Sequence, residues 1–261
     1  MEVRHPKIMI VALLIGREGS QGFPGKNIKP ILGRPLMTYP ILAAKSSKYV
    51  EEVYVSTDSE KIKEISRACG AKTIDRPAEL ASSKALGQDA FVHGYQVIRD
   101  ELKKEGKEVE FIALMHCNAP TILASQIDEA VEILRNHPEY DSAVTAGKMN
   151  MYHPLRARKI NNEGLLDYIA PLEAIGDPRT MSCDRDSAGN AYFADVALSL
   201  VRPRCLENVK AGLMPHQWMG QKIYPVMNEA GVDIDYEWQW GQMEWWLKHN
   251  GFTEEKTPYD K

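Results

Sequence analysis

Apolar, strand-like runs alternate with helix-like segments through the first half of the chain, and this alternation limits the possible folds more than any other feature. Residues 8–15 are continuously apolar, as expected for a strand that is covered on both faces. Four later segments also have the character of strands: 53–56, 72–74, 111–115 and 142–146. Helices are predicted between them, at 35–47, 90–104 and 125–135. This order predicts an α/β fold with a mostly parallel sheet and helices on both of its faces.

The regular alternation stops after residue 148. Residues 149–185 contain Pro154, Pro171 and Pro178 between short polar pieces, which is typical of an excursion inserted into a larger domain. A strand-like segment returns at 191–201, and the chain closes with an extended stretch at 232–235 and a helix at 237–249. We find no internal repeat and no clear linker, so we expect one domain over residues 1–261.

The composition is that of a mildly acidic chain, with 32 basic and 36 acidic side chains, a net charge of −4 and a pI of about 6.0. A nucleic-acid-binding protein would need an excess of Lys and Arg and is not expected, whereas a small anionic ligand in a local basic pocket is compatible. The four cysteines form no C-x-x-C pair, which favours reduced thiols in a cytoplasmic protein. The run at 8–15 is shorter than the about 20 residues that span a bilayer, and no cleavage pattern follows it, so we expect neither a membrane span nor a signal peptide.

A glycine-rich loop directly follows the first predicted strand. Residues 16–27 read GREGSQGFPGKN, and the glycines let backbone N–H groups approach a ligand closely. Arg17 and Lys26 would add positive charge for phosphates, so the loop is typical of an anion-binding site. The spacing matches neither the G-x-G-x-x-G motif nor the Walker A motif, which disfavours a Rossmann dehydrogenase. On composition alone, a solvated surface loop with two cations remains an alternative.

Two further motifs carry charges that suit a nucleotide and a metal ion. Asp233 and Asp235 lie two residues apart on an extended segment, so their carboxylates point to the same side and could together bind Mg²⁺. Taken alone, such a pair is more often a solvated strand end that caps the following helix. Arg76, followed by Pro77, could contact a nucleotide or be a surface arginine before a helix.

A polar segment reading HCNAP follows the strand predicted at 111–115. In a parallel sheet, this carboxyl end of a strand is where ligands bind. We do not expect His116 and Cys117 to form a nucleophilic pair, because adjacent residues of an extended segment point apart. Four tryptophans crowd the last predicted helix, for which we favour packing of an aromatic face or a dimer contact over a stacking platform for a base.

In their order along the chain, these segments resemble the acylneuraminate cytidylyltransferase family. The family loop (A)-R-x-x-S-x-G-x-P-x-K-N corresponds to residues 16–27, V-S-T-D to 55–58, and R-P-A-E-L-A to 76–81. The family motif H-P-L corresponds to 153–155, and I-D-I-D-x-E to VDIDYE at 232–237. The resemblance extends from residue 8 to about residue 247. Five motifs in the right order favour the functional interpretation of the aspartate pair and of Arg76.

The resemblance implies a Rossmann-like, three-layer α/β nucleotidyltransferase fold whose inserted segment, 149–185, serves dimerisation. It implies a homodimer that transfers CMP from CTP to the anomeric hydroxyl of a 2-keto-3-deoxy sugar acid, with Mg²⁺ as cofactor and pyrophosphate as second product. The residues that it implies for nucleotide binding are Gly16, Arg17, Ser20, Lys26, Asn27, Arg76 and Ala85. Asp233 and Asp235 would bind Mg²⁺, and catalysis would rest on Arg17, Lys26 and Asp233. Such chemistry needs positioning and charge neutralisation more than a protein nucleophile.

Departures from the family motifs are concentrated on the acceptor side. Where the family has L-Q-P-T-S-P, residues 115–120 read MHCNAP, so His116 replaces a glutamine that typically meets the sugar. The motif R-P-N-G-A-I-Y has its nearest counterpart in SAGNAYF at 187–193, which lacks the arginine expected to pair with a sugar carboxylate. His116, Asn118 and Asn190 are therefore the candidate acceptor-binding residues. Two alternatives stay open: a different small acidic acceptor such as a phosphonate, and a nucleotide-binding protein without catalytic activity.

Overall fold

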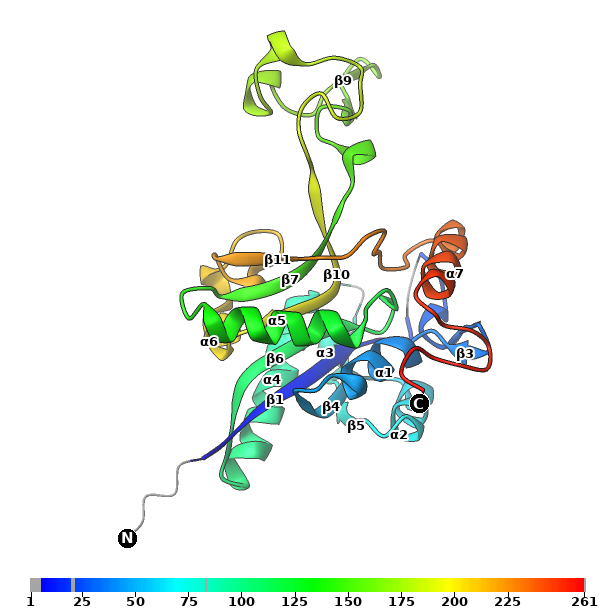
Figure 1. Ribbon diagram of the computed structural model, residues 1–261, viewed down its shortest axis with the longest axis vertical. Helices are drawn as coiled ribbons and strands as arrows, with labels where there is room; N and C mark the ends of the chain where they lie inside the picture. The colour runs from blue at the N-terminus through cyan, green and yellow to red at the C-terminus, as the bar shows by residue number, and fades with distance from the viewer. Residues whose placement is uncertain (1–5, 20–21, 83, 261) are drawn as a thin grey trace.

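A seven-stranded sheet forms the centre of the computed structural model, which describes residues 6–19, 22–82 and 84–260 (Figure 1). The strand order is β11-β7-β10-β6-β1-β4-β5. In chain order the strands are β1 (Lys7–Ile15), β4 (Val50–Thr57), β5 (Lys72–Asp75), β6 (Lys107–His116), β7 (Ser142–Lys148), β10 (Tyr192–Val201) and β11 (Ile223–Met227). Neighbouring strands are parallel, except that β10 runs antiparallel to both β6 and β7. The predicted, mostly parallel sheet is confirmed.

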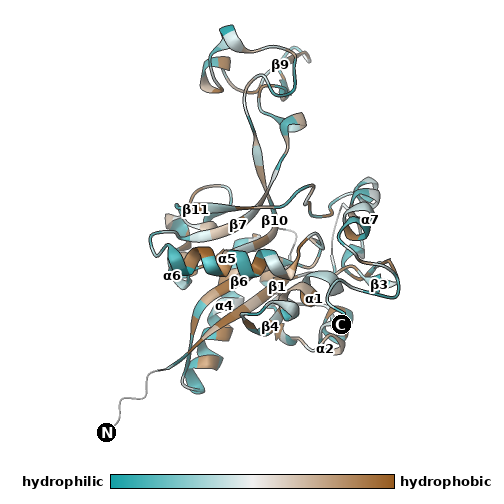
Figure 2. Cartoon of the chain, in the orientation of Figure 1, coloured by the Kyte–Doolittle hydropathy of each residue, from teal (hydrophilic) through white to brown (hydrophobic). Residues whose placement is uncertain are grey.

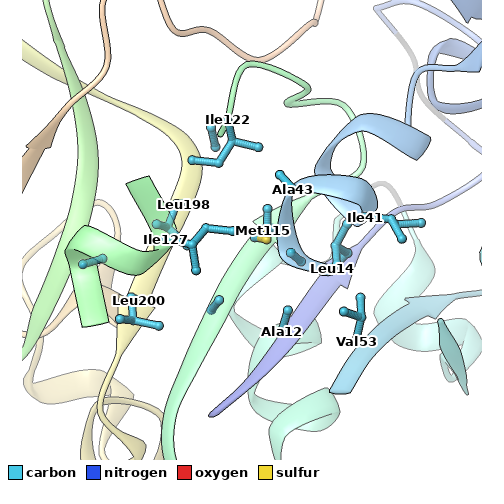
Figure 3. Close-up of a cluster of buried hydrophobic side chains, with 14 of the residues drawn as sticks. Ala12, Leu14, Ile41, Ala43, Val53, Met115, Ile122, Ile127, Leu198 and Leu200 are labelled. Carbon is cyan, nitrogen blue, oxygen red and sulfur yellow. The ribbon is translucent and has the colours of Figure 1, made fainter. Parts of the chain in front are cut away.

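Helices cover both faces of this sheet and complete three layers. They are α1 (Thr38–Ser46), α2 (Glu60–Ala68), α3 (Ala78–Ala81), α4 (Gly87–Lys104), α5 (Ala124–Asn136), α6 (Pro203–Glu207) and α7 (Trp240–His249). Side chains of α1, α2 and α5 join one hydrophobic cluster, part of which is drawn in Figure 3, whereas those of α4 and α6 join a second cluster. Within the described ranges, no helix combines the length and the apolar character that crossing a membrane requires.

Strand β1 is apolar and buried from Met9 to Ile15, because both of its faces are covered there. Leu14 belongs to the cluster that contains α1, and its neighbour Leu13 belongs to the cluster that contains α4. On the second face, α4 packs closely at Gly94, where a Cβ atom would lie 2.6 Å from Leu13 Cδ2. Figure 2 shows β1 and β6 as the apolar centre of the molecule. Residues 9–15 of the predicted apolar run are thus apolar because they are buried on both sides, whereas Ile8 is exposed.

The C-terminal part packs beside the sheet as a third cluster with the hairpin β2 (Pro30–Ile31) and β3 (Arg34–Pro35). The stretch 232–235, predicted as extended, belongs to no strand, and the predicted helix at 237–249 divides into a 3-10 turn (Glu237–Gln239) and α7. Trp246 is buried and donates a 3.0 Å hydrogen bond to the Glu229 carbonyl. The expected packing of the aromatic helix against the body thus holds for Trp240 and Trp246, whereas Trp238 and Trp245 are exposed.

The ends of β7 and β10 leave the body together as a two-stranded stalk that carries a small lobe, residues 149–191 (Figure 1). The lobe contains the hairpin β8 (Arg158–Ile160) and β9 (Leu166–Tyr168) and several 3-10 turns. The excursion predicted at 149–185 falls within this lobe. The lobe is rich in exposed apolar side chains: Met151, Tyr152, Ile160, Leu165, Leu166, Tyr168 and Ile169.

Candidate active site

A cavity of about 370 Å³ lies where β1 and β6 end. All but two of the predicted site residues line it: Gly16, Arg17, Lys26, Asn27, Arg76, Ala85, His116, Asn118, Asp233 and Asp235. These residues are far apart in the sequence. Gly16, Arg76 and His116 meet because the carboxyl ends of parallel strands share one edge of the sheet, and the others reach that edge on the connecting segments. Of the other two, Ser20 lies outside the described residues, and Asn190 lies at the lobe.

Two glycines of the loop allow close contacts between segments of the protein itself. A Cβ atom on Gly16 would lie 2.7 Å from Cys117 Sγ, and one on Gly22 would lie 2.5 Å from the carbonyl oxygen of Asp235. The backbone N–H of Gly16 also donates a 3.2 Å hydrogen bond to the Ser56 carbonyl. The loop is thus held against the ends of β4 and β6 and against the aspartate segment, which side chains at these positions would prevent.

Lys26 is one of the charged residues that line the cavity. Its side chain is buried, and its Nζ donates a 2.7 Å hydrogen bond to Asp235 Oδ1 and another to the Ile234 carbonyl. The Asp235 side chain remains largely exposed, at 61%. The cation is therefore fixed by the fold, while its carboxylate partner can turn to another positive charge.

Asp233 is more enclosed than Asp235. Burial, followed by the nearby charge of Asp235, raises the pKa of Asp233 to about 6. Asn118 Nδ2 donates to Asp233 Oδ2 at 3.3 Å and to the Ile234 carbonyl at 2.9 Å. A divalent cation would relieve the repulsion between these two carboxylates. Asp233 and Asp235 together therefore suit such an ion.

The donor set also indicates which ion would fit. No group of three or more His, Cys, Asp or Glu side chains suited to a metal occurs in the described part of the chain. A cation at Asp233 and Asp235 would thus rely on two carboxylates together with ligand oxygens and water. This is the coordination that Mg²⁺ commonly takes beside substrate phosphates.

Two arginines also line the cavity: Arg17 belongs to the loop, and Arg76 follows β5. Arg76 is buried, its Nε donates to Ser56 Oγ at 3.3 Å, and its Nη2 donates to the Ser56 carbonyl. Arg17 Nη1 donates to the Ser82 carbonyl at 2.6 Å and so reaches across to the end of α3. Asn27 donates through Nδ2 to the Arg17 carbonyl, whereas its buried Oδ1 has no hydrogen-bond partner among the described residues. Arg17, Arg76 and Asn27 all line the cavity, which therefore has fixed positive charge on this side.

His116 ends β6 and faces the cavity as a neutral imidazole. Its Nδ1 lies 3.1 Å from the Val196 carbonyl, and because a carbonyl only accepts, Nδ1 carries the proton and Nε2 is an acceptor. Burial lowers the pKa of His116 to about 4. Burial also raises the pKa of the adjacent Cys117 thiol to about 12, which agrees with the expectation that the two do not form a nucleophilic pair.

The first turn of α4 is a part of the site that sequence reasoning missed. Leu86, Gly87 and Ala90 line the cavity, and the helix begins at Gly87 instead of residue 90. Leu86 stands at the N-cap without a side-chain hydrogen bond, so the sequence carries no capping signal there. The free N–H groups and positive dipole end of this turn suit an anion beside the glycine loop.

Asn190 is not brought to this cavity within the chain, contrary to its grouping with His116 and Asn118. It precedes β10 and accepts a 3.2 Å hydrogen bond from Asn150 Nδ2 at the base of the lobe. The antiparallel stalk pairs Tyr192 with Lys148, which carries the preceding residues away from the edge of the sheet. None of the tryptophans lines the cavity either, so a stacking platform for a base does not form there within the described chain.

We expect the affinity of the Asp233 and Asp235 pair for a divalent cation to fall below pH 6. The cation binds the ionised carboxylate, and the pKa of Asp233, about 6, lies above its ordinary value, so protons compete as the pH drops. Between about pH 7 and about pH 5, Mn²⁺ should bind about tenfold more weakly, as measured by calorimetry. Equal Mn²⁺ affinity at both pH values would contradict this assignment.

Comparison with known families decides which proteins share these features. Residues 11–162, more than half of the chain, match the family model described as cytidylyltransferase. The chain belongs to the cytidylyltransferase family. The match covers the glycine loop, Arg76 and the end of β6, whereas the aspartate pair lies beyond it.

Relatives of this cytidylyltransferase family member extend the likeness over most of the chain. It is 28% identical to N-acylneuraminate cytidylyltransferase A of Danio rerio over 251 residues, which is 95% of this chain and 53% of the relative. It is 31% identical to 8-amino-3,8-dideoxy-manno-octulosonate cytidylyltransferase of Shewanella amazonensis over 141 residues, or 53% of each chain. The chain thus spans about half the length of these curated relatives.

Solved structures support the fold of the family member. A CMP:2-keto-3-deoxy-manno-octonic acid synthetase complexed with CTP aligns with a TM-score of 0.65 at 18% identity, covering 92% of this chain and 99% of the other. A 4-diphosphocytidyl-2C-methyl-D-erythritol synthase from Anaerococcus prevotii aligns with a TM-score of 0.57 at 13% identity, covering 92% and 98%. The fold is the expected Rossmann-like α/β fold.

Proposed function

We propose that the protein transfers CMP from CTP to the anomeric hydroxyl of a 2-keto-3-deoxy sugar acid and releases pyrophosphate. The observation that carries this proposal is the convergence, in one cavity, of three cations with two carboxylates: Arg17, Lys26 and Arg76 with Asp233 and Asp235. Membership of the cytidylyltransferase family supports the nucleotide half. The names of relatives that act on acylneuraminate and octulosonate support an acidic keto sugar as acceptor.

The residues of the cavity can supply what attack on an α-phosphate requires. Lys26 and Arg17, together with the N–H groups of the first turn of α4, would hold and neutralise the triphosphate. Asp233 and Asp235 would hold Mg²⁺, which when bound supplies charge neutralisation and lowers the pKa of the attacking hydroxyl. Lys26, now paired with Asp235, would then exchange this carboxylate for a phosphate oxygen. No protein nucleophile is needed.

Asn27 supports the placement of the cytidine. Asn27 lines the cavity, and its enclosed Oδ1 has no partner among the described residues, so a turn of this amide toward a ligand donor would satisfy it. The amino group of cytosine and the ribose hydroxyls are such donors. Buried Arg76 lies on the same cavity wall and would complete this end of the site.

The acceptor would lie between the phosphates and the end of β6. His116 offers a neutral Nε2 as hydrogen-bond acceptor, and Asn118 lies beside Asp233. A sugar hydroxyl can donate to Nε2, and the acceptor's anomeric hydroxyl would face the α-phosphate. The uncharged side chain of His116 suits recognition of a sugar hydroxyl. It would not pair with the carboxylate of the acceptor, which needs a positively charged side chain other than residue 116.

The proposal is tested by measuring pyrophosphate release. The protein would be incubated with CTP, Mg²⁺ and a panel of nonulosonic acids, octulosonic acids and small phosphonates, with GTP, ATP and UTP in place of CTP as controls. We expect release with CTP and a keto sugar acid. Release with a phosphonate alone would favour the alternative acceptor, and CTP binding without release from any acceptor would favour a non-catalytic protein.

We further propose that the lobe joins two copies of the chain into a homodimer. Ile160 and Leu166 are directly paired across the hairpin of β8 and β9 and are 73% and 75% exposed. Exposed apolar side chains gathered on one small lobe are typical of a protein–protein interface.

Replacing both Ile160 and Leu166 by aspartate should convert the dimer to a monomer of 29.4 kDa in size exclusion with light scattering, because burying two unpaired charges is costly. The matched control is Leu213→Asp, since Leu213 is 53% exposed on the body. A wild-type chain that is already monomeric would contradict the proposal.

We also propose a cytoplasmic location. Cys69, Cys117, Cys183 and Cys205 are all free thiols in the structure. Free thiols persist most readily in a reducing compartment. Fractionation of the source cells with an antibody against the chain would test this location.

A further inference from the structure

A buried carboxylate lies between the stalk and the active site, where the proposed chemistry does not use it. Asp195 is 7% exposed and accepts hydrogen bonds from three donors. Thr145 Oγ1 of β7 and the N–H of Ala197, at 3.0 Å, donate to Oδ1, and Asn228 Nδ2 donates to Oδ2 at 2.5 Å. An enclosed carboxylate is costly unless it is paired in this way, so its retention calls for a reason.

On one side, Asp195 holds an irregular turn inside β10. The pairing of β10 with β7 is interrupted between Ala194 and Ser199, and Val196 has a φ of 52°. A β-branched residue is strained in this left-handed region and keeps the conformation only when its surroundings enforce it. The carbonyl of Val196 accepts the Nδ1 proton of His116, so the turn determines which nitrogen of His116 faces the cavity.

On the other side, Asp195 is linked through Asn228 to the segment that precedes Asp233. Asn228 also donates through Nδ2 to the Thr121 carbonyl at 2.7 Å, and Thr121 Oγ1 exchanges hydrogen bonds with the backbone of Val232. Gly231 packs directly on the pair, because a Cβ atom there would lie 2.2 Å from both Asp195 Oδ2 and Asn228 Nδ2. Gly231 and Val232 immediately precede Asp233.

We propose that Asp195 is a positioning residue that sets both His116 and the Asp233 loop, through the turn at Val196 on one side and through Asn228 and Gly231 on the other. The role rests on the proposed function of the cavity, since positioning has a purpose only if His116 and Asp233 act there. Supporting partners of metal and substrate ligands typically affect metal affinity or activity by about 10- to 100-fold.

The test is the Asp195→Asn variant of the full chain. An asparagine has one acceptor oxygen where three donors now converge, so at least one of them loses its partner. With ¹⁵N-labelled histidine, the wild-type His116 should show the Nδ1-protonated tautomer, identified by its loss in His116→Gln, and the variant should show a mixture. Mn²⁺ affinity should fall at least about fivefold and kcat about tenfold, whereas CTP affinity without metal should stay within about twofold.

The matched control is Asp128→Asn, which removes another buried carboxylate. Asp128 accepts hydrogen bonds from Ser47 Oγ at 2.6 Å and from the N–H of Lys48 at 2.9 Å, away from the cavity. It should lower thermal stability without changing the His116 tautomer or Mn²⁺ affinity. If Asp128→Asn changes them as much as Asp195→Asn does, the effect is general destabilisation and the proposal is overturned.

A second variant keeps the proposal testable if Asp195→Asn does not fold. Gly231→Ala adds one methyl group against the Asp195 and Asn228 pair without altering a charge, and it should weaken Mn²⁺ binding. Wild-type Mn²⁺ affinity in Gly231→Ala and in every folded Asp195 variant would overturn the proposal. Absence of pyrophosphate release in the wild type would instead remove the proposed function, while the tautomer and Mn²⁺ measurements would still report on positioning.

Discussion

Replacing Asp233 by asparagine should lower kcat for pyrophosphate release about 1,000-fold while leaving the fold intact. The side chain keeps its shape and can still accept from Asn118, which lies 3.3 Å away. What it loses is the negative charge that would hold Mg²⁺ beside the phosphates. Pyrophosphate release under saturating CTP measures kcat, and Mn²⁺ calorimetry measures the metal affinity, which should be nearly abolished.

Glu237→Gln is the matched control for this loss. Glu237 follows Asp235 by two residues, is exposed, and pairs with Lys29 at 3.6 Å. Neutralising it removes one negative charge from the same stretch without touching the cavity, so kcat should change less than about twofold. An Asp233→Asn enzyme with wild-type turnover would show that the metal, if required, is held elsewhere.

Replacing Lys26 by methionine should raise the Kd for CTP and lower kcat, together about 100-fold or more in kcat/KM. Methionine has a similar length and suits the buried path of the side chain, so the loss isolates the charge. Lys26 is held in place by the fold, since it is buried and bonded to Asp235 and to the Ile234 carbonyl. Calorimetry with CTP and steady-state pyrophosphate release separate the binding and catalytic parts.

Lys29→Met is the control, because Lys29 lies one turn further on but outside the cavity. Its Nζ is 4.6 Å from the centre of the Phe23 ring, and its side chain is 43% exposed. This variant should keep wild-type CTP affinity. If Lys26→Met binds CTP as the wild type does, the loop is not the triphosphate site.

Local patterns in the sequence predicted the layers and most of the site. A strand buried on both faces must be apolar at every position, so the run at 8–15 was visible without tertiary information. The glycine loop with Arg17 and Lys26 was visible through its composition, whereas the aspartate pair and Arg76 gained their functional interpretation only from the resemblance to the family. The carboxyl edge of the sheet joins Arg17 after β1 with His116 at the end of β6, whereas Lys26 and the aspartates reach the same cavity on segments outside the strands.

Three features did not follow from local patterns. The first turn of α4 starts at Gly87 without a capping side chain, so nothing in the sequence marks its N–H groups as part of the site. Asn190 matched a family motif, yet the stalk carries it away from the cavity. Asp195 lies in a segment with no unusual composition, and its partners Thr145 and Asn228 come from 50 and 33 residues away.

The sequence by itself predicted which chemistry the chain would carry: cations on a glycine loop for phosphates, two carboxylates for a metal, and a strand and helix order typical of one shared sheet edge. Only the tertiary structure decided how these groups are held. Lys26 paired with Asp235, the neutral tautomer of His116 and the Asp195 network depend on contacts between residues distant in the chain. Packing in three dimensions decides which groups are buried and which hydrogen bonds they form. Burial and hydrogen bonds in turn decide the protonation state and the orientation of each side chain in the site, which composition and spacing do not encode.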